Sequence, residues 1–432
     1  MPTTGLIQIV AVPAAVRIPL GGAICGNQGC AIGKIAVPAQ TSAGGNEMGR
    51  SSEFRKTRNA ARRGVLSLAP LVAALLVGCS GEEGSDAVTA APEPVTKAAV
   101  NEPKAVAPPR DRDALRSRAA AVFGTLPVEA SNPENAITPA KVELGRILYY
   151  DPRLSKNHDV SCNTCHLLDR HGVDGRPTSS GHREQLGGRN APTVYNAALH
   201  IAQFWDGRAA DVEEQAKGPV LNPIEMAMPS EAAAVAVLKS IPGYAPLFAA
   251  AFPDDQDPIS YDNMARAIGA FERKLLTPSP LDAFIAGDDS ALNDEQLAGL
   301  EAFVSAGCIA CHQGPAIGGG LYQKLGVIKP YPTEDPGRAG ITGNEADRQV
   351  FKVPSLRNVA KTSPYLHDGS IQELSEMIRI MAEYQLGIPV DDAQVSAISA
   401  FLGSLTGEPD AELIAMPELP PSGPDTPAAD PR

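Results

Sequence analysis

The chain has 432 residues, of which 43% are hydrophobic and 20% are charged, and this composition excludes a wholly disordered or fibrous protein. Its net charge of −13 argues against an open nucleic-acid surface, because phosphate binding requires clustered Lys and Arg. Four of the seven Cys and two of the seven His fall into two copies of one short motif, so the sequence carries a specific chemical signal.

An export signal is predicted within residues 1–78. A basic stretch at 55–63 precedes an uncharged apolar run at 65–78, which is shorter than the ~20 residues that a membrane-spanning helix needs. The sequence Leu76-Val77-Gly78-Cys79 resembles the lipobox of bacterial lipoproteins, in which the Cys is lipidated and becomes the mature N-terminus. We therefore expect a periplasmic protein that is anchored to the membrane through a lipid on Cys79.

Two further expectations concern the same part of the chain. Because a signal peptide normally comes first, we expect Met48 to be the true start and residues 1–47 to be a mis-called extension. Residues 79–112 are rich in Ala, Pro, Glu and Gly and have no apolar period, which predicts a flexible linker.

The repeated motif is C-x-x-C-H, at Cys162-Asn163-Thr164-Cys165-His166 and at Cys308-Ile309-Ala310-Cys311-His312. This is the pattern of c-type haem attachment, in which two thiols bind the haem and the adjacent His supplies an axial nitrogen to the iron. A redox-active Cys pair needs no following His, and two pairs that share one zinc lie only ~15–20 residues apart. The motifs therefore predict two covalently bound c-type haems.

The chain also repeats itself around these motifs. Pro192–Asn196 parallels Pro354–Asn358, and each Asn is followed by an Asp-Gly pair at the same distance. The segment at 267–275 likewise matches the one at 397–405, on probable helices with one apolar stripe. We predict a mainly α fold of two tandem cytochrome c-like haem domains related by internal duplication. Their predicted bounds are 113–277 and 278–410, followed by a Pro-rich, poorly packed tail at 411–432.

The sixth ligand of each iron is not fixed by spacing alone. His171, His182 and His200 are all local candidates for the first haem. For the second haem, Met377 and Met381 are four residues apart and share one helical face, so both are plausible. Core methionines would follow the same pattern.

Long segments of the chain resemble bacterial di-haem cytochrome c peroxidases. The resemblance covers about 115–407 and includes DPRLSKNHDVSCNTCH, GGRNAPTVYNAALHIAQFWDGRA and VPSLRNVAKTSPYLHDGS. It implies that the N-terminal haem is low-potential and peroxidatic, and that the C-terminal haem is high-potential and accepts electrons. The implied reaction is the reduction of hydrogen peroxide to water with electrons from a small cytochrome c or cupredoxin. The family is often dimeric, which implies a homodimer.

The resemblance also implies axial ligands for both haems. His166 and His312 match the proximal ligands, and His182 matches the displaceable distal ligand of the N-terminal haem. The family pattern places the last ligand fourteen residues after the His of PYLHDG, at Met381. A His/Met pair raises the haem potential relative to a His/His pair, which suits an electron-accepting centre.

Further roles follow from the resemblance alone. Glu225 matches the acid/base residue of the peroxide pocket, and Trp205 matches the residue that bridges the two haems. Asn190, Thr362 and Pro364 match the positions that bind an interdomain calcium ion, the last two through backbone carbonyls.

Two other functions remain compatible with two haems. The first is an electron carrier with two closed haems and no peroxidase activity, which would need no acid/base residue such as Glu225. The second is a related di-haem enzyme that oxidises tryptophans in a partner protein, which has Tyr as a ligand of the second haem where this chain offers Met381.

Overall fold

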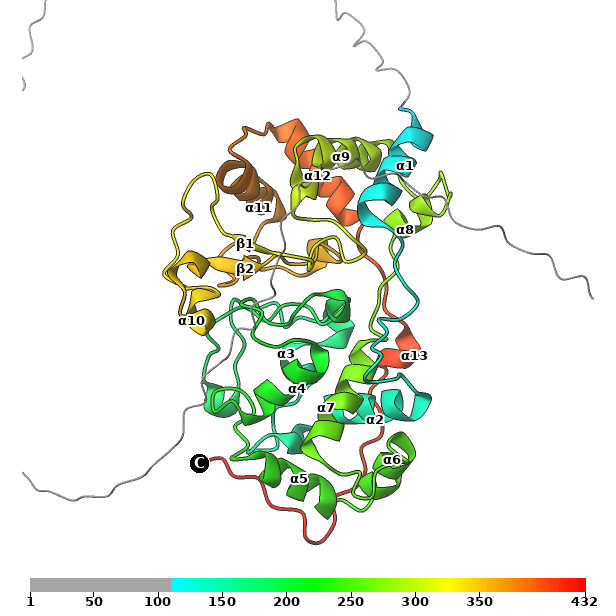
Figure 1. The fold of residues 1–432 in the computed structure, drawn as a ribbon, viewed down its shortest axis with the longest axis vertical. Coiled ribbons are helices and arrows are strands. Elements are labelled where there is room, and N and C mark those ends of the chain that lie inside the picture. The colour runs from blue at the N-terminus through cyan, green and yellow to red at the C-terminus, as the bar shows by residue number, and fades with distance from the viewer. Residues whose placement is uncertain (1–109) are drawn as a thin grey trace, which may run out of the picture. The chain divides into compact units, whose positions relative to one another are not determined.

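The computed structural model describes residues 110–432, and the predicted export signal, Cys79 and most of the predicted linker lie outside the described residues. The described part is mainly helical, as predicted (Figure 1). The α-helices are α1 (Arg112–Phe123), α2 (Pro139–Tyr150), α3 (Cys162–Cys165), α4 (Val212–Leu221), α5 (Glu231–Ser240), α6 (Tyr244–Ala251), α7 (Tyr261–Glu272), α8 (Pro280–Ile285), α9 (Asp294–Ser305), α10 (Ala339–Thr342), α11 (Leu374–Ile380), α12 (Asp392–Gly403) and α13 (Ala411–Ile414).

Shorter elements connect these helices. Single 3-10 turns occupy Pro152–Leu154, Leu168–Arg170, His182–Glu184, Ala197–Leu199, Cys308–Ala310, Glu345–Asp347 and Val359–Lys361, and a π-helical segment spans Met381–Leu386. Strands β1 (Tyr322–Lys324) and β2 (Val350–Lys352) form one antiparallel pair with Gln323 opposite Phe351. Among residues 110–432, no single helix has the length and hydropathy to cross a bilayer, although the sharply bent pair α5 and α6 reaches that threshold jointly.

Two close helix crossings organise the described residues. Gly145 on α2 lies against the backbone of Ala267 on α7, where an added Cβ would overlap the Ala267 carbonyl oxygen. Gly299 on α9 lies in the same way against Ala397 on α12. Only glycine permits backbones to approach so closely. One helix of each crossing, α7 or α12, carries one of the two matched segments at 267–275 and 397–405.

Each crossing belongs to its own hydrophobic core. The first core is formed by buried side chains from α2, α4, α5, α6 and α7 and the loops between them. The second core is formed by buried side chains from α1, α8, α9, α11 and α12. Leu115, Ala119 and Phe123 of α1 thus pack into the second core, and Figure 1 shows α1 beside α8. The predicted bounds, which assigned residue 113 onward to the first domain, are wrong for this helix.

The C-terminal tail packs against the first core, although it follows the helices of the second core in the sequence. We expected it to be poorly packed, but Leu413, Ile414 and Leu419 pack against the first core. The Tyr150 hydroxyl donates to the Ile414 carbonyl at 2.5 Å, and Arg146 donates to the Ala415 carbonyl at 2.8 Å. Apolar residues between the prolines thus give the tail a surface to bury.

The described chain has two halves, one around each hydrophobic core, and a buried threonine connects them. The side-chain amides of Asn196 and Asn358 both donate to the Thr277 hydroxyl, at 2.8 and 2.9 Å. Both Asn residues have a φ of 62°, a conformation that Asn tolerates better than most residues. The matched Asn positions therefore meet at one residue of the linking segment.

Candidate functional site

The first C-x-x-C-H motif lies on α3, beside the first core. Ser161 and Thr164 form a capping box that starts this short helix, and the Ser161 amide donates to the Thr164 hydroxyl at 2.9 Å. Cys162 packs against the first core, and the thiols of Cys162 and Cys165 are not joined in a disulfide. The helix therefore presents two free thiols and His166 at successive positions.

One thiol of each motif differs from those of a redox-active pair. Burial raises the pKa of Cys165 and of Cys308 to about 11, whereas reactive thiols have lowered pKa values and electropositive surroundings. Within residues 110–432, no three His, Cys, Asp or Glu side chains are grouped so that they could hold a metal ion. The arrangement therefore disfavours both the redox-pair and the zinc interpretation.

His182 and Glu225 lie together in the first half. The backbone amide of His182 donates to the carbonyl oxygen of Glu225 at 2.7 Å. Gly181 allows this approach, because a Cβ at that position would overlap the backbone of Ile224 and Glu225. The His182 side chain is buried, and its Nδ1 has no hydrogen-bond partner. The structure thus brings together the two residues that the resemblance assigned to the peroxide pocket.

The Glu225 carboxyl group is suited to holding a proton. Burial raises its pKa above the usual range, because desolvation disfavours the ionised form. The charge of Arg208 and a hydrogen bond that Asn222 donates to Oε1 at 2.8 Å oppose this rise. A rise in the pKa of a carboxyl group moves it toward the range in which it can both give and accept a proton.

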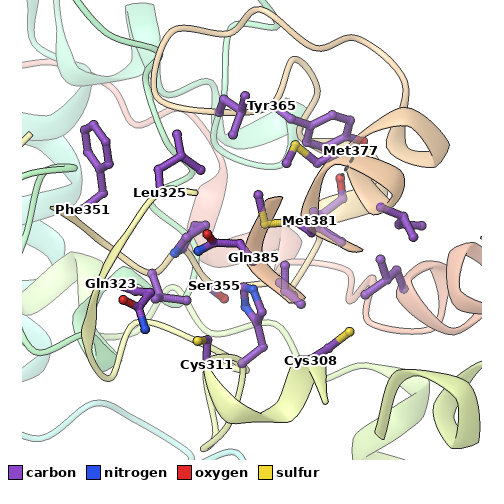
Figure 2. Close-up of a pocket in the computed structure, with 18 of the residues that line it drawn as sticks. Cys308, Cys311, Gln323, Leu325, Phe351, Ser355, Tyr365, Met377, Met381 and Gln385 are labelled. Atoms are coloured by element: carbon purple, nitrogen blue, oxygen red, sulfur yellow. Dashed lines mark hydrogen bonds between the residues drawn. The ribbon is translucent and has the colours of Figure 1, made fainter. Parts of the chain in front are cut away.

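The second C-x-x-C-H motif lines a cavity of about 250 Å³, called the second cavity after its motif. Figure 2 shows Cys308 and Cys311 on one side of this cavity and Met377 and Met381 on the other. The remaining walls are mostly apolar and include Leu325 and Phe351. A cavity of this kind, with a few sulfur and nitrogen ligands on an apolar lining, suits a flat and largely apolar cofactor.

Met381 is placed differently from Met377. It begins the π-helical segment that follows α11, and such segments occur frequently at functional sites. In Figure 2 the Met381 side chain points into the middle of the cavity, whereas Met377 lies beside Tyr365. Both residues line the cavity, so the helical spacing noted in the sequence is retained.

The two motif histidines are in the protonation state that metal ligands require. Burial lowers the pKa of His166, and it lowers the pKa of His312 to about 4. The rings therefore stay neutral at physiological pH, and a neutral imidazole is the form that coordinates iron. Nδ1 of each ring is buried without a hydrogen-bond partner. Together with the free thiols, these residues fit a c-type haem at each motif.

Trp205 lies between the two halves. Its indole nitrogen donates to the Asn190 carbonyl at 2.9 Å, and its carbonyl accepts from the Lys352 amide at 2.8 Å. The backbone amide of Asn190 in turn donates to the His367 carbonyl at 2.7 Å. Trp205 also lines the second cavity, together with Asn190, Thr362 and Pro364, the predicted calcium ligands.

The other two histidine candidates lie elsewhere. His171 lines a separate pocket beside Glu408 and Pro409, and His200 lines the second cavity. Only His182, among the three, contacts Glu225 through the backbone. Sequence reasoning missed Lys352, which bonds His200, although a lysine inside the apolar run VFKVPSL was a usable signal.

Comparison with known proteins agrees with this geometry. A family model described as di-haem cytochrome c peroxidase matches residues 139–290. The chain is 48% identical to the cytochrome c551 peroxidase of Nitrosomonas europaea, over 71% of this chain and 90% of the relative. It is 44% identical to the cytochrome c551 peroxidase of Pseudomonas aeruginosa, over 73% of this chain and 92% of the relative.

A solved structure shows the same fold. It is a MauG-like protein associated with microbial copper homeostasis, which matches with a TM-score of 0.61 and 30% identity. The match covers 68% of this chain and 95% of that protein. Both motifs have free thiols and neutral, buried imidazoles, and the chain matches its relatives over most of their length. The chain therefore belongs to the di-haem cytochrome c peroxidase family.

Proposed function

We propose that this protein is a cytochrome c peroxidase that reduces hydrogen peroxide to two water molecules, using two electrons and two protons. The observation that carries the proposal is the backbone contact between His182 and Glu225, which brings a partly buried carboxyl group of raised pKa near a candidate distal ligand. A pure electron carrier has no need of such a pair.

When bound, the two haems supply the electrons and the iron site at which peroxide reacts. The Glu225 carboxylate would accept a proton from the peroxide oxygen nearer the iron site and deliver it to the other peroxide oxygen, so that water is the leaving group. Asn222 orients the carboxyl group through its bond to Oε1.

We propose that His182 is the displaceable ligand on the peroxide side of the first haem. It begins a single 3-10 turn in a loop where Arg183 and Glu184 both have a positive φ. Positive φ values are unfavourable for residues other than glycine, so a modest change elsewhere can shift this loop to another conformation.

The electron donor is a small redox protein, and electrons enter at the second haem. The relatives are named as peroxidases of cytochrome c551, which supports a small cytochrome as the donor. A cupredoxin remains an alternative donor that direct competition between the two proteins in a turnover assay would reveal.

Mixing the half-reduced holoprotein with hydrogen peroxide in a stopped-flow instrument tests the function. We expect both haems to oxidise within one turnover and the cycle to continue when a reduced cytochrome is added. A holoprotein that exchanges electrons with the cytochrome but leaves peroxide unconsumed would identify an electron carrier instead.

Replacing Met381 with His should lower the potential of the second haem, because a nitrogen donor favours ferric iron more than a thioether does. Redox titration measures the change, and Met377→Leu is the matched control, for which we expect the wild-type potential. The reverse pattern would assign the ligand to Met377.

Several structural proposals accompany this function. We propose an internal duplication, supported by the equivalent Gly145 and Gly299 crossings. An experimental structure in which the two halves fail to superpose would refute it.

We also propose a calcium ion near Asn190, Thr362 and Pro364, because oxygen ligands suit that cation and the three residues line one cavity. Elemental analysis of the purified holoprotein checks it.

We further propose export, acylation at Cys79 and a homodimer in the periplasm. The first two rest on the basic and apolar stretches that precede Cys79, and the dimer rests on the resemblance alone. The mass of the mature N-terminal peptide and sedimentation analysis of the detergent-solubilised protein are the corresponding measurements.

A further inference from the structure

Lys352 is a buried lysine that faces the second cavity. Only 6% of the residue is exposed, although it lies at the end of β2. It is the sole Asp, Glu, Lys or Arg among the described residues that line this cavity. An ammonium group in such a place is costly unless an anion or several acceptors compensate its charge.

The partners of Lys352 within the described residues do not provide that compensation. Its Nζ bonds Nδ1 of His200 at 3.0 Å, and no carboxylate of residues 110–432 forms an ion pair with it. Because an ammonium group only donates, Nδ1 of His200 accepts and the ring is neutral. Burial and the charge of Lys352 lower the pKa of His200 well below its usual value, which agrees with that assignment. Two N–H donors of Lys352 therefore lack a partner.

The position of this pair is fixed by the backbone. The Lys352 amide donates to the Trp205 carbonyl at 2.8 Å. Gly319 leaves room for the His200 ring, since a Cβ there would overlap it, and the Gly319 amide donates to the Val353 carbonyl at 2.8 Å. The lysine is thus held at the cavity wall and does not reach in from a mobile surface.

The other buried lysine is a useful contrast. Lys141, on α2, is 7% exposed and donates to the Asn135 side chain at 3.0 Å and to the Ala136 carbonyl at 3.1 Å. It has two oxygen acceptors, whereas Lys352 has none. Burial lowers the pKa of Lys352 to about 8, and an anion in contact would raise it again.

We propose that the missing partner of Lys352 is a carboxylate of the second haem, and that this contact raises the reduction potential of that haem. The inference rests on the proposed function, because it requires a haem in the second cavity. A haem carries two propionate carboxylates, and Lys352 is the one fixed cation among the cavity-lining residues described. Neutralising a carboxylate near the iron favours the reduced state, which carries less positive charge. Lys352 is therefore a positioning residue that also tunes the electron-accepting centre.

Redox titration of the second haem in three variants of the holoprotein tests this inference. Lys352→Gln removes the charge, and we expect the ratio of reduced to oxidised haem at a fixed potential to fall at least tenfold, which is 59 mV for a one-electron couple. Lys352→Arg keeps the charge and should restore most of the wild-type potential. A wild-type potential in Lys352→Gln, or an equal fall in both variants, would overturn the proposal.

His200→Leu separates the carboxylate from the histidine as the main partner of Lys352. With a carboxylate present, Lys352 stays charged without His200, so the potential should fall by less than in Lys352→Gln. An equal fall would mean that His200 alone holds the charge, and the proposal would fail. If neither Lys352 variant retains the second haem, His200→Leu is compared with the wild type: a fall below 59 mV supports the carboxylate partner, and a fall of 59 mV or more overturns the proposal.

Haem content, counted by mass spectrometry on the same samples, keeps the two levels of inference apart. A wild-type chain without a second covalent haem would refute the proposed function. If the protein carries two haems and the potential of the second haem is unchanged in Lys352→Gln, only the inference about Lys352 is refuted.

Discussion

Glu225→Gln is expected to lower peroxide turnover by about 10²–10⁴-fold, the usual contribution of a positioned proton-transfer group. The amide is nearly isosteric and can still bond Asn222, but it cannot accept the peroxide proton. Both haems and their potentials should be unchanged. Steady-state peroxide assays and redox titrations on one preparation measure these two expectations.

A matched control lies in the loop that carries His182. Glu184 is exposed, and Glu184→Gln removes one carboxylate near the site without changing the partly buried Glu225. We expect this variant to turn over normally, which would separate a general loss of negative charge from the specific role of Glu225. Near-normal activity of Glu225→Gln at pH 6–7 would remove Glu225 from the mechanism.

His182→Gly is expected to open the first haem without prior reduction of the second. We propose that release of His182 in the wild type is linked to reduction of the other haem, and coupling free energies of about 1–3 kcal/mol are typical of linked sites. The glycine variant needs no such coupling, because the ligand is gone. Electron paramagnetic resonance of the fully oxidised variant should show high-spin iron, and peroxide should react at once.

His171→Gly is the control for this experiment. Nδ1 of His171, like Nδ1 of His182, is buried without a hydrogen-bond partner among the described residues. The φ of His171 is 54°, which glycine adopts readily. We expect the oxidised His171→Gly protein to keep a low-spin first haem. If His182→Gly stays low-spin and His171→Gly becomes high-spin, the gating ligand is His171.

The haem motifs could be predicted because their determinants are local. Each C-x-x-C-H motif carries its chemistry within five residues. The close helix crossings at Gly145 and Gly299 were not predicted, because the backbone that each glycine contacts belongs to a helix distant in the sequence. The family and its activity, which those motifs and the long matching segments predicted, are confirmed by the relatives.

What the sequence could not predict depends on distant partners. The apolar face of α1 indicates that the helix is buried, but not which core receives it, and it packs into the second. His200 and Lys352 are 152 residues apart, so no local pattern connects them. The choice between Met377 and Met381 is similar, because a shared helical face is compatible with either and only the family pattern favours Met381. The π-helical segment that begins at Met381 has no sequence signature.

The crossed ends of the chain constrain how the protein can be made. Arg146 on α2 bonds the carbonyl of Ala415, 269 residues later, and Arg112 on α1 bonds Asp294, 182 residues later. The N-terminal half therefore cannot complete its surface until the ribosome has finished the chain, and contacts between such distant residues slow folding. Neither half is a self-sufficient unit when it is cut near Thr277, because each would leave behind a segment that covers the other.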